Sequence, residues 1–253
     1  MGQIFQLGLI GNPVAHSQSP KIFQEFFDNE NLPNWNYNLF QLENINELAG
    51  LINNNPNLVG FNVTVPFKQS IIPLLNTTSD AAKAINAVNT VKVIRNNGDI
   101  FLEGHNTDYF GFFETMKELP SKPKKAIILG NGGSANAVKA VLNDIEIPFI
   151  TVSRNPTAGQ ISYGSLLDLT FNEHTLIIQT TPVGMSPKVD VSPVFPFKHL
   201  NENVMAIDLI YNPKETLFLK QFKNHGCFCL NGSLMLQKQA EMAWTIFKNN
   251  EKN

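Results

Sequence analysis

A lysine and two polar strand residues stand close together in the stretch GFNVTVPFK (60–68). A strand period of two sends Asn62 and Thr64 to one face and three apolar residues to the other, namely Phe61, Val63 and Val65. Pro66 cannot continue the hydrogen-bond ladder, so Lys68 begins a loop or helix just past the strand's carboxyl end, where open α/β sheets place ligands. An ammonium group there could hydrogen-bond a carbonyl oxygen and donate a proton to it, although a lone surface lysine is the simpler interpretation.

Two serines precede a predicted helix in HSQSPK, where Ser17 and Ser19 stand before Pro20. Serine at the N-cap and proline at the first helical position are a common helix start, so Ser19 is a candidate cap. Two hydroxyls at a helix N-terminus also suit a carboxylate, and the two roles do not exclude each other.

An asparagine–glycine turn in RNNGD predicts a β-hairpin. With the turn centred on that dipeptide, Asn89 lies roughly opposite Asn106, so Asn89 and Asp108 should sit close in space. The same polar stretch could instead cap the helix that follows, through Asn106, Thr107 or Asp108.

A glycine-rich turn in LGNGGSANA follows one predicted strand and opens a helix. At Gly130, Gly132 and Gly133 bare backbone can approach a pyrophosphate, whose charge the helix N-terminus favours. About 20 residues later, where a ribose-reading residue is expected, the sequence has Arg154. An arginine can pair bidentately with a 2′-phosphate, which favours NADP over NAD, although a solvated strand-end charge is the alternative.

The elements that must position these residues fall into two groups. The first hundred residues alternate apolar runs with helical patterns in a β-α-β-α-β layout that favours parallel strands. After the linker ELPSKPKK, further strands and helices continue to residue 232 and predict a second parallel sheet. The closing helical pattern carries Gln239 on the same face as several core candidates, so a satisfied core glutamine is as good an interpretation as a ligand.

Length and composition limit the possible functions. A chain of 253 residues favours two domains, and a net charge of −2 offers no basic footprint for nucleic acid, so a small-molecule partner is expected. The N-terminus lacks the pattern of a signal peptide and the apolar runs are short, so a cytoplasmic protein without a membrane span is expected. Cys227 and Cys229 point to one strand face and are interpreted as buried thiols; no metal site is expected.

Together these stretches resemble the shikimate dehydrogenase family, in order and spacing, over nearly the whole chain. HSQSP, NVTVPFK, INAVNT and HNTD look like that family's substrate and catalytic motifs, and GNGGSANA, SRN, TTPVGM and NGSLMLQKQA look like its cofactor and C-terminal motifs. The resemblance implies an α/β fold with a cleft between an N-terminal substrate-binding and catalytic domain (1–108, joined by a C-terminal helix, 233–253) and a Rossmann-type, doubly wound NADP-binding domain (109–232).

The resemblance also implies roles for individual residues. Lys68 and Asp108 would carry the catalysis. The residues implied to hold the substrate, besides Asp108, are Ser17, Ser19, Asn62, Thr64, Asn89, Tyr211 and Gln239. Those implied to bind the cofactor are Gly130, Asn131, Gly132, Gly133, Ser134, Ser153, Arg154, Thr181, Leu209 and Gly232.

Several positions depart from the family's usual pattern. In SRNPTAGQ, Arg154 is not followed by the second basic residue that is usual in the family. This difference predicts a weaker preference for NADP. Gln179, Asn231 and Leu209 also replace commoner residues, but none of these changes removes a reacting group.

The implied activity is the reversible NADPH-dependent reduction of 3-dehydroshikimate to shikimate, on the route to chorismate and the aromatic amino acids, by a monomer or homodimer. Two alternatives are a quinate/shikimate dehydrogenase that uses NAD and a non-catalytic NADP-binding sensor of the same fold. A sensor is expected to lack at least one of Lys68 and Asp108, and both are present.

Overall fold

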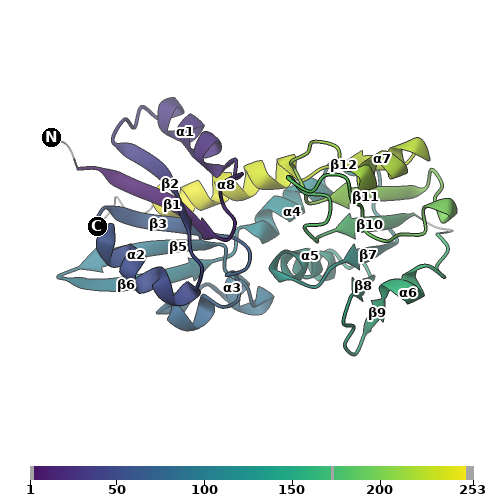
Figure 1. Cartoon of the computed structure of the whole chain (residues 1–253), viewed down its shortest axis with the longest axis horizontal. Coiled ribbons are helices and arrows are strands. Elements are labelled where there is room, and N and C mark those ends of the chain that lie inside the picture. The colour runs from purple at the N-terminus through teal and green to yellow at the C-terminus, as the bar shows by residue number, and fades with distance from the viewer. Residues whose placement is uncertain (1–2, 172–173, 249–253) are drawn as a thin grey trace. The chain divides into compact units, whose positions relative to one another are not determined.

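The computed structural model describes residues 3–171 and 174–248, and its chain divides into two compact units. One consists of Met1–Phe110 with Gln237–Asn253, and the other of Gly111–Leu236. The first unit therefore contains both the start of the chain and most of its last helix, α8 (Ser233–Lys248) (Figure 1).

The first unit is built on a six-stranded mixed sheet in the order β2-β1-β3-β5-β6-β4. Its parallel part is the predicted β-α-β-α-β layout, made by β1 (Phe5–Gly11), α1 (Ser19–Asn29), β2 (Trp35–Gln41), α2 (Leu48–Asn54) and β3 (Leu58–Val63). A two-stranded hairpin, β5 (Thr90–Asn96) and β6 (Asp99–His105), runs antiparallel beside β3. The short η1 (Ile45–Glu47) leads directly into α2 and belongs to the same predicted helical pattern, whereas η2 (Ile72–Leu74), β4 (Thr77–Thr78) and α3 (Asp80–Ile85) were not predicted from the sequence.

The hairpin has the predicted turn and register. Asn97 and Gly98 both adopt positive φ angles, 49° and 93°, as a tight asparagine–glycine turn requires. Thr90 pairs with His105, and the Asn89 N–H donates to the His105 carbonyl at 3.0 Å, so Asn89 lies next to the start of the stretch that follows β6.

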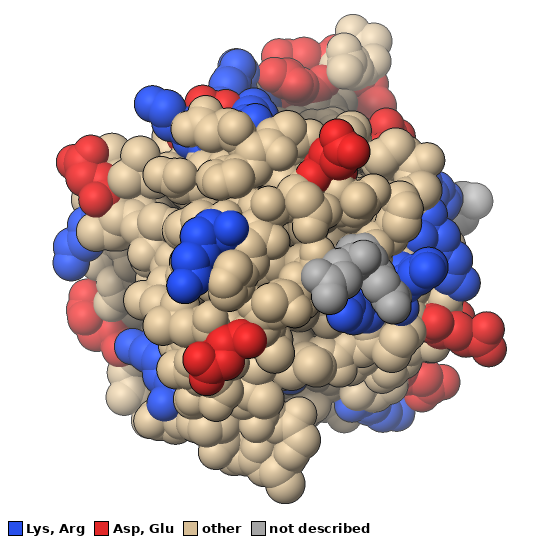
Figure 2. Space-filling view, turned by 90° about the vertical axis from the view of Figure 1, so that its right-hand side faces the viewer, with Lys and Arg blue, Asp and Glu red and all other residues tan. Residues whose placement is uncertain are grey.

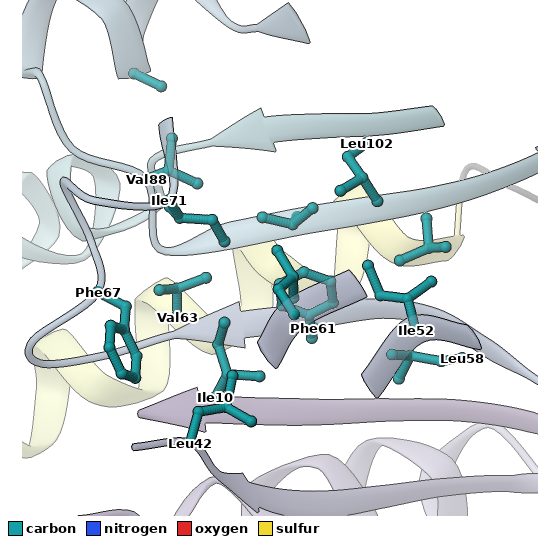
Figure 3. Close-up of a cluster of buried hydrophobic side chains, with 14 residues drawn as sticks. Ile10, Leu42, Ile52, Leu58, Phe61, Val63, Phe67, Ile71, Val88 and Leu102 are labelled. Carbon is teal, nitrogen blue, oxygen red and sulfur yellow. The ribbon is translucent and has the colours of Figure 1, made fainter. Parts of the chain in front are cut away.

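Apolar side chains cover one face of this sheet. Phe61 and Val63 of β3 pack there with Ile10 of β1 and with residues from the surrounding loops, as Figure 3 shows. Val65 was predicted on the same face and is instead 59% exposed, because β3 ends at Val63 and the chain turns immediately afterwards.

The opposite face carries an aromatic cluster between the sheet, α1 and α8. Its rings are those of Phe23, Phe26, Phe27, Trp35, Tyr37, Trp244 and Phe247. The Trp244 indole N–H and the Lys248 ammonium group each donate to Oε1 of Glu30 at 2.7 Å, which ties α8 to the end of α1. Glycine is needed at position 60, because a Cβ there would lie 2.5 Å from the Phe247 ring.

The second unit has a six-stranded parallel sheet in the order β12-β11-β10-β7-β8-β9. Its elements are α4 (Asp108–Met116, which begins in the first unit), β7 (Lys125–Leu129), α5 (Gly133–Asp144), β8 (Phe149–Ser153), β9 (Gln160–Ser162), α6 (Tyr163–Leu166), β10 (Thr175–Gln179), η3 (Phe197–His199), β11 (Val204–Asp208), α7 (Leu217–Asn224) and β12 (Phe228–Leu230). Read from the other edge, this is the Rossmann strand order, with the order reversing between β7 and β10. The predicted α/β fold with a doubly wound second sheet is confirmed.

The two cysteines lie at the far edge of this sheet, in and beside β12. Cys227 is buried and Cys229 half-buried, and both pack in the same apolar cluster. Burial raises the pKa of the Cys227 thiol to about 11 and that of Cys229 to about 12, so both are protonated at neutral pH. Within residues 3–171 and 174–248, no group of three or more His, Cys, Asp or Glu side chains is arranged to hold a metal ion.

The surface in Figure 2 shows acidic and basic side chains interspersed, with large areas that carry neither charge. In the part of the chain that the structure describes, no helix is both long enough and apolar enough to span a membrane.

Candidate active site

A buried ion pair joins the two predicted catalytic residues. Lys68 Nζ donates to Asp108 Oδ2 at 2.5 Å, and the two side chains are only 13% and 7% exposed. Lys68 stands on the turn after β3 and Asp108 is the first residue of α4, so the pair forms where the carboxyl end of a strand meets the start of a helix.

Asn89 holds the other carboxylate oxygen of this pair. Its Nδ2 donates to Asp108 Oδ1 at 2.8 Å and to Thr107 Oγ1 at 3.0 Å, while its Oδ1 accepts the Thr107 backbone N–H at 2.7 Å. The predicted proximity of Asn89 and Asp108 is confirmed. Because both Asp108 oxygens accept a hydrogen bond inside the protein, the carboxylate has a fixed orientation.

The alternative in which Asp108 merely caps α4 fails, because a neighbour takes that role. Asn106 Oδ1 accepts the Tyr109 backbone N–H at 3.2 Å, and Asn106 Nδ2 donates to the Ala87 carbonyl at 2.9 Å. The Asp108 carboxylate therefore accepts hydrogen bonds from Lys68 and Asn89 instead.

Asn62 belongs to the same network and uses three of its hydrogen-bonding positions inside the protein. Its Nδ2 donates to the Asn89 carbonyl at 3.2 Å and to Thr90 Oγ1 at 3.1 Å, and its Oδ1 accepts the Tyr37 hydroxyl at 2.9 Å. Thr64 lies just beyond the end of β3, where its backbone N–H donates to the Ile10 carbonyl at 2.9 Å.

The two serines differ from the expected helix start. Helix α1 begins at Ser19, its N-cap residue is Gln18, and no side chain makes an N-cap hydrogen bond, so the interpretation of Ser19 as the cap is wrong. Instead, Ser17 Oγ accepts the Ser19 backbone N–H at 3.2 Å and donates to Ser19 Oγ at 3.1 Å. Helix α1 starts one position earlier than predicted, so the buried Ser19 hydroxyl does not cap it.

One hydrogen-bonded series therefore connects most of the predicted site residues of the first unit. It runs from Tyr37 through Asn62 and Asn89 to Asp108 and Lys68, while Ser17 and Ser19 hydrogen-bond to each other. A branch passes from Thr107 Oγ1 to Gln239 Oε1 at 3.3 Å, so Gln239 joins this network.

Tyr37 belongs to this hydrogen-bond network, but none of the sequence motifs indicated it. The alternation in WNYNL places Trp35 and Tyr37 on one strand face, and a buried phenol normally finds a hydrogen-bond partner. That signal could have indicated a polar contact, but not which one.

The glycine-rich turn of the second unit leaves space for a ligand at the start of α5. Gly130 has a φ of +112°, and a Cβ there would lie 2.6 Å from Thr180 Oγ1 and 2.9 Å from Thr181 Cγ2. Gly132 is the N-cap of α5, and a Cβ there would meet nothing within 4 Å. Bare backbone beside open space at a helix N-terminus, at the point where the strand order reverses, fits a dinucleotide pyrophosphate.

The other predicted cofactor residues lie at strand ends of the same sheet. Ser153 ends β8, and Arg154 follows it as an exposed side chain. Gly232 packs on the backbone of Leu209, since a Cβ would lie 2.0 Å from the Leu209 carbonyl oxygen. Tyr211 also belongs to this unit, so its contact with a substrate held by the first unit stays a prediction.

Asp208, which no motif indicated, anchors the loop that carries Leu209 and Tyr211. Its side chain is fully buried at the end of β11, where Oδ2 accepts the Thr216 hydroxyl at 2.6 Å and Oδ1 accepts the Ile210 N–H at 3.0 Å. Burial raises the pKa of Asp208 to about 6, although both hydrogen bonds oppose the shift.

Asp208 should make the stability of the protein depend on pH. A pKa that is higher in the folded state gives stability that is present below the unfolded-state value of about 3.9 and is lost as the pH rises through about 6. The difference in unfolding free energy between wild type and Asp208→Asn should therefore change by about 2–3 kcal/mol between pH 4 and pH 7, in favour of the variant. Urea unfolding at both pH values measures this change; a pH-independent difference would contradict it.

Comparisons with known proteins agree with this geometry. Residues 9–91 match the family model described as the shikimate dehydrogenase substrate binding domain. The chain is 38% identical to the shikimate dehydrogenase (NADP(+)) of Desulforamulus reducens, over 95% of this chain and 89% of the relative. It is 37% identical to that of Methanococcus vannielii, over 96% and 92%. The crystal structure of shikimate dehydrogenase 1 from Peptoclostridium difficile has a TM-score of 0.85 and 32% identity, covering 97% of this chain and 92% of that one. The chain belongs to the shikimate dehydrogenase family.

Proposed function

We propose that the chain catalyses the reversible NADPH-dependent reduction of 3-dehydroshikimate to shikimate. The observation that carries the proposal is the buried Lys68–Asp108 pair, fixed by Asn89, in a chain of this family. It supports an enzyme rather than a cofactor-binding sensor, because a sensor has no need of a buried ammonium group held by a carboxylate.

Reduction of a ketone requires a hydride on carbon and a proton on oxygen. NADPH, when bound, supplies the hydride. Lys68 Nζ hydrogen-bonds the carbonyl oxygen and donates a proton as negative charge develops on it; in the oxidation direction the neutral amine takes the proton from the alcohol. Asp108 holds Lys68 in position and accepts a hydrogen bond from a substrate hydroxyl.

The remaining residues of the network are proposed to hold the substrate. Ser17 and Ser19 bind its carboxylate, because both are hydroxyls at the start of α1. The ring hydroxyls are held by four side chains of the first unit together with Tyr211 of the second; the four are Asn62, Thr64, Asn89 and Gln239. The first unit is thus the substrate-binding and catalytic domain.

The second unit is proposed to bind NADP. The glycine turn, Gly130 to Gly133, with Asn131 and Ser134, would take the pyrophosphate at α5. Ser153 and Arg154 would read the 2′-phosphate, and Thr181, Leu209 and Gly232 would lie along the rest of the cofactor. We further propose that the enzyme acts in the cytoplasm as a monomer or homodimer; light scattering tests the assembly state.

The decisive assay follows NADPH absorbance with 3-dehydroshikimate, and the reverse reaction with shikimate and NADP. Quinate with NAD is the comparison, since a quinate dehydrogenase would prefer that pair. Turnover of 3-dehydroshikimate with NADPH supports the proposal. An absence of turnover with both pairs would leave only the sensor interpretation.

Arg154→Ala should weaken NADPH binding about tenfold to a hundredfold and NADH binding far less. A charge-assisted bidentate pair with the 2′-phosphate contributes about 1.5–3 kcal/mol, and NADH has no such phosphate. Fluorescence titration of both cofactors measures the two affinities. Lys220→Ala, which removes another exposed cation of the same unit, is the control and should change neither. If the affinities for NADPH and NADH fell by the same factor, Arg154 would not recognise the 2′-phosphate.

A further inference from the structure

Tyr37 hydrogen-bonds Asn62, a residue proposed to hold the substrate, although it lies two strands away from it. In the sheet, β1 separates β2, which carries Tyr37, from β3, which carries Asn62. Tyr37 pairs with Leu7 and Asn62 with Leu9, so both side chains stand on the same sheet face and the phenol reaches across β1. Its hydroxyl meets Asn62 Oδ1 at 2.9 Å.

The position of this hydroxyl is fixed by packing. Tyr37 is only 9% exposed, and its ring stacks on Phe23 of α1 with a centroid distance of 4.4 Å and an interplanar angle of 24°. Burial raises the pKa of Tyr37, so the phenol keeps its proton at any physiological pH. The group is therefore a permanent donor with one proton to give.

Counting donors sets the direction of each hydrogen bond. Both N–H groups of Asn62 Nδ2 are used by the Asn89 carbonyl and Thr90 Oγ1, so Asn62 Oδ1 must accept the Tyr37 proton. The Ser19 hydroxyl opposes the rise in the Tyr37 pKa, and it can do so only as a donor, because the phenol proton is already used. Ser17 in turn donates to Ser19.

This count also limits what Asn62 can offer a ligand. Its two donors are occupied, and only one lone pair of Oδ1 is left. Asn62 can therefore only accept from a substrate hydroxyl. The phenol thus leaves Asn62 Oδ1 with a defined orientation and one free acceptor position.

We propose that Tyr37 is a positioning residue for substrate binding, which holds Asn62 Oδ1 as an acceptor toward the substrate. This role rests on the proposed function in one respect, namely that the substrate is shikimate. Tyr37 does not contact the reacting atoms in this role. Loss of its hydroxyl should therefore weaken substrate binding and leave the rate of the chemical step nearly unchanged.

The test is Tyr37→Phe, which keeps the ring and its stacking and removes only the hydroxyl. Calorimetric titration with shikimate should show about a five- to fiftyfold weaker Kd, and the KM for shikimate should rise by the same order. The values of kcat and of KM for NADP should stay within about twofold. Thr115→Val is the matched control, because it removes another buried hydroxyl, one whose hydrogen bond among the described residues is to the Gly111 carbonyl of its own helix.

A double variant tests whether the phenol acts through Asn62. In Asn62→Ala with Tyr37→Phe, the rise in Kd should be smaller than the product of the two single effects. An unchanged shikimate Kd in Tyr37→Phe, or a loss matched by Thr115→Val, would overturn the proposal. If the wild type binds shikimate without oxidising it, the proposed activity fails while the calorimetric comparison still decides the role of Tyr37.

Discussion

Lys68→Ala should lower kcat by about a hundredfold to ten-thousandfold while the KM for shikimate and the affinity for NADPH change little. This range is the usual contribution of a general acid–base group, and the structure places the ammonium group in a buried pair rather than in solvent. The loss should fall on kcat, because the proton moves in the transition state and contributes little to holding the ground state. Steady-state kinetics in both directions measures it.

The control for Lys68→Ala is Lys83→Ala, which removes an exposed lysine of the same unit that also pairs with an aspartate, Asp80. Removing Lys68 leaves Asp108 buried with Asn89 as its remaining side-chain donor among the described contacts, so some loss of stability is expected. Circular dichroism and thermal melting show whether the variant is folded. If the folded variant keeps more than about a tenth of the wild-type kcat, another group must supply the proton.

Asp108→Asn should lower kcat by about a hundredfold and also raise the KM for shikimate about tenfold. The carboxylate accepts from Lys68 on one oxygen and from Asn89 on the other. An asparagine has one acceptor oxygen and one NH₂ group, so one of these donors must face another donor. Lys68 loses its fixed position and the substrate loses a hydroxyl acceptor, which is why both constants change.

The matched control is Asp80→Asn, since Asp80 is a fully exposed carboxylate of the same unit that pairs with a lysine. It should leave both constants unchanged, because an exposed pair contributes little. If Asp108→Asn altered kcat alone, Asp108 would position Lys68 without contacting the substrate. If neither constant changed, the buried pair would be structural.

Turn chemistry explains why the sequence predicted one half of the site so well. The asparagine–glycine dipeptide at 97–98 allows few hairpin registers, and that register alone brings Asn89 to the stretch that contains Asp108. For Lys68 the local pattern indicated only a place past the carboxyl end of β3, and its catalytic role came from the family resemblance. Local rules were sufficient wherever a turn fixed the geometry.

The other features of the site depend on packing between distant elements, which no local sequence pattern indicates. The start of α1 differs by one position from the expected start, so neither serine caps the helix and Ser17 Oγ accepts the Ser19 backbone N–H instead. The contact of Tyr37 with Asn62 crosses a strand, so it requires the order of β2, β1 and β3 and the stacking on Phe23. Val65 leaves the apolar face because the strand ends before it.

The tie between Glu30 and helix α8 has a consequence for how the protein forms during synthesis. The two hydrogen bonds on Glu30 span 214 and 218 residues of sequence. A nascent chain that has left the ribosome only as far as residue 236 contains the whole second unit but only the first turn of α8, the helix that covers the aromatic face of the first unit. The second unit, a continuous segment, can therefore fold while the first is still incomplete. In the first unit, Trp35 and its neighbouring rings stay uncovered until Trp244 and Phe247 have been translated.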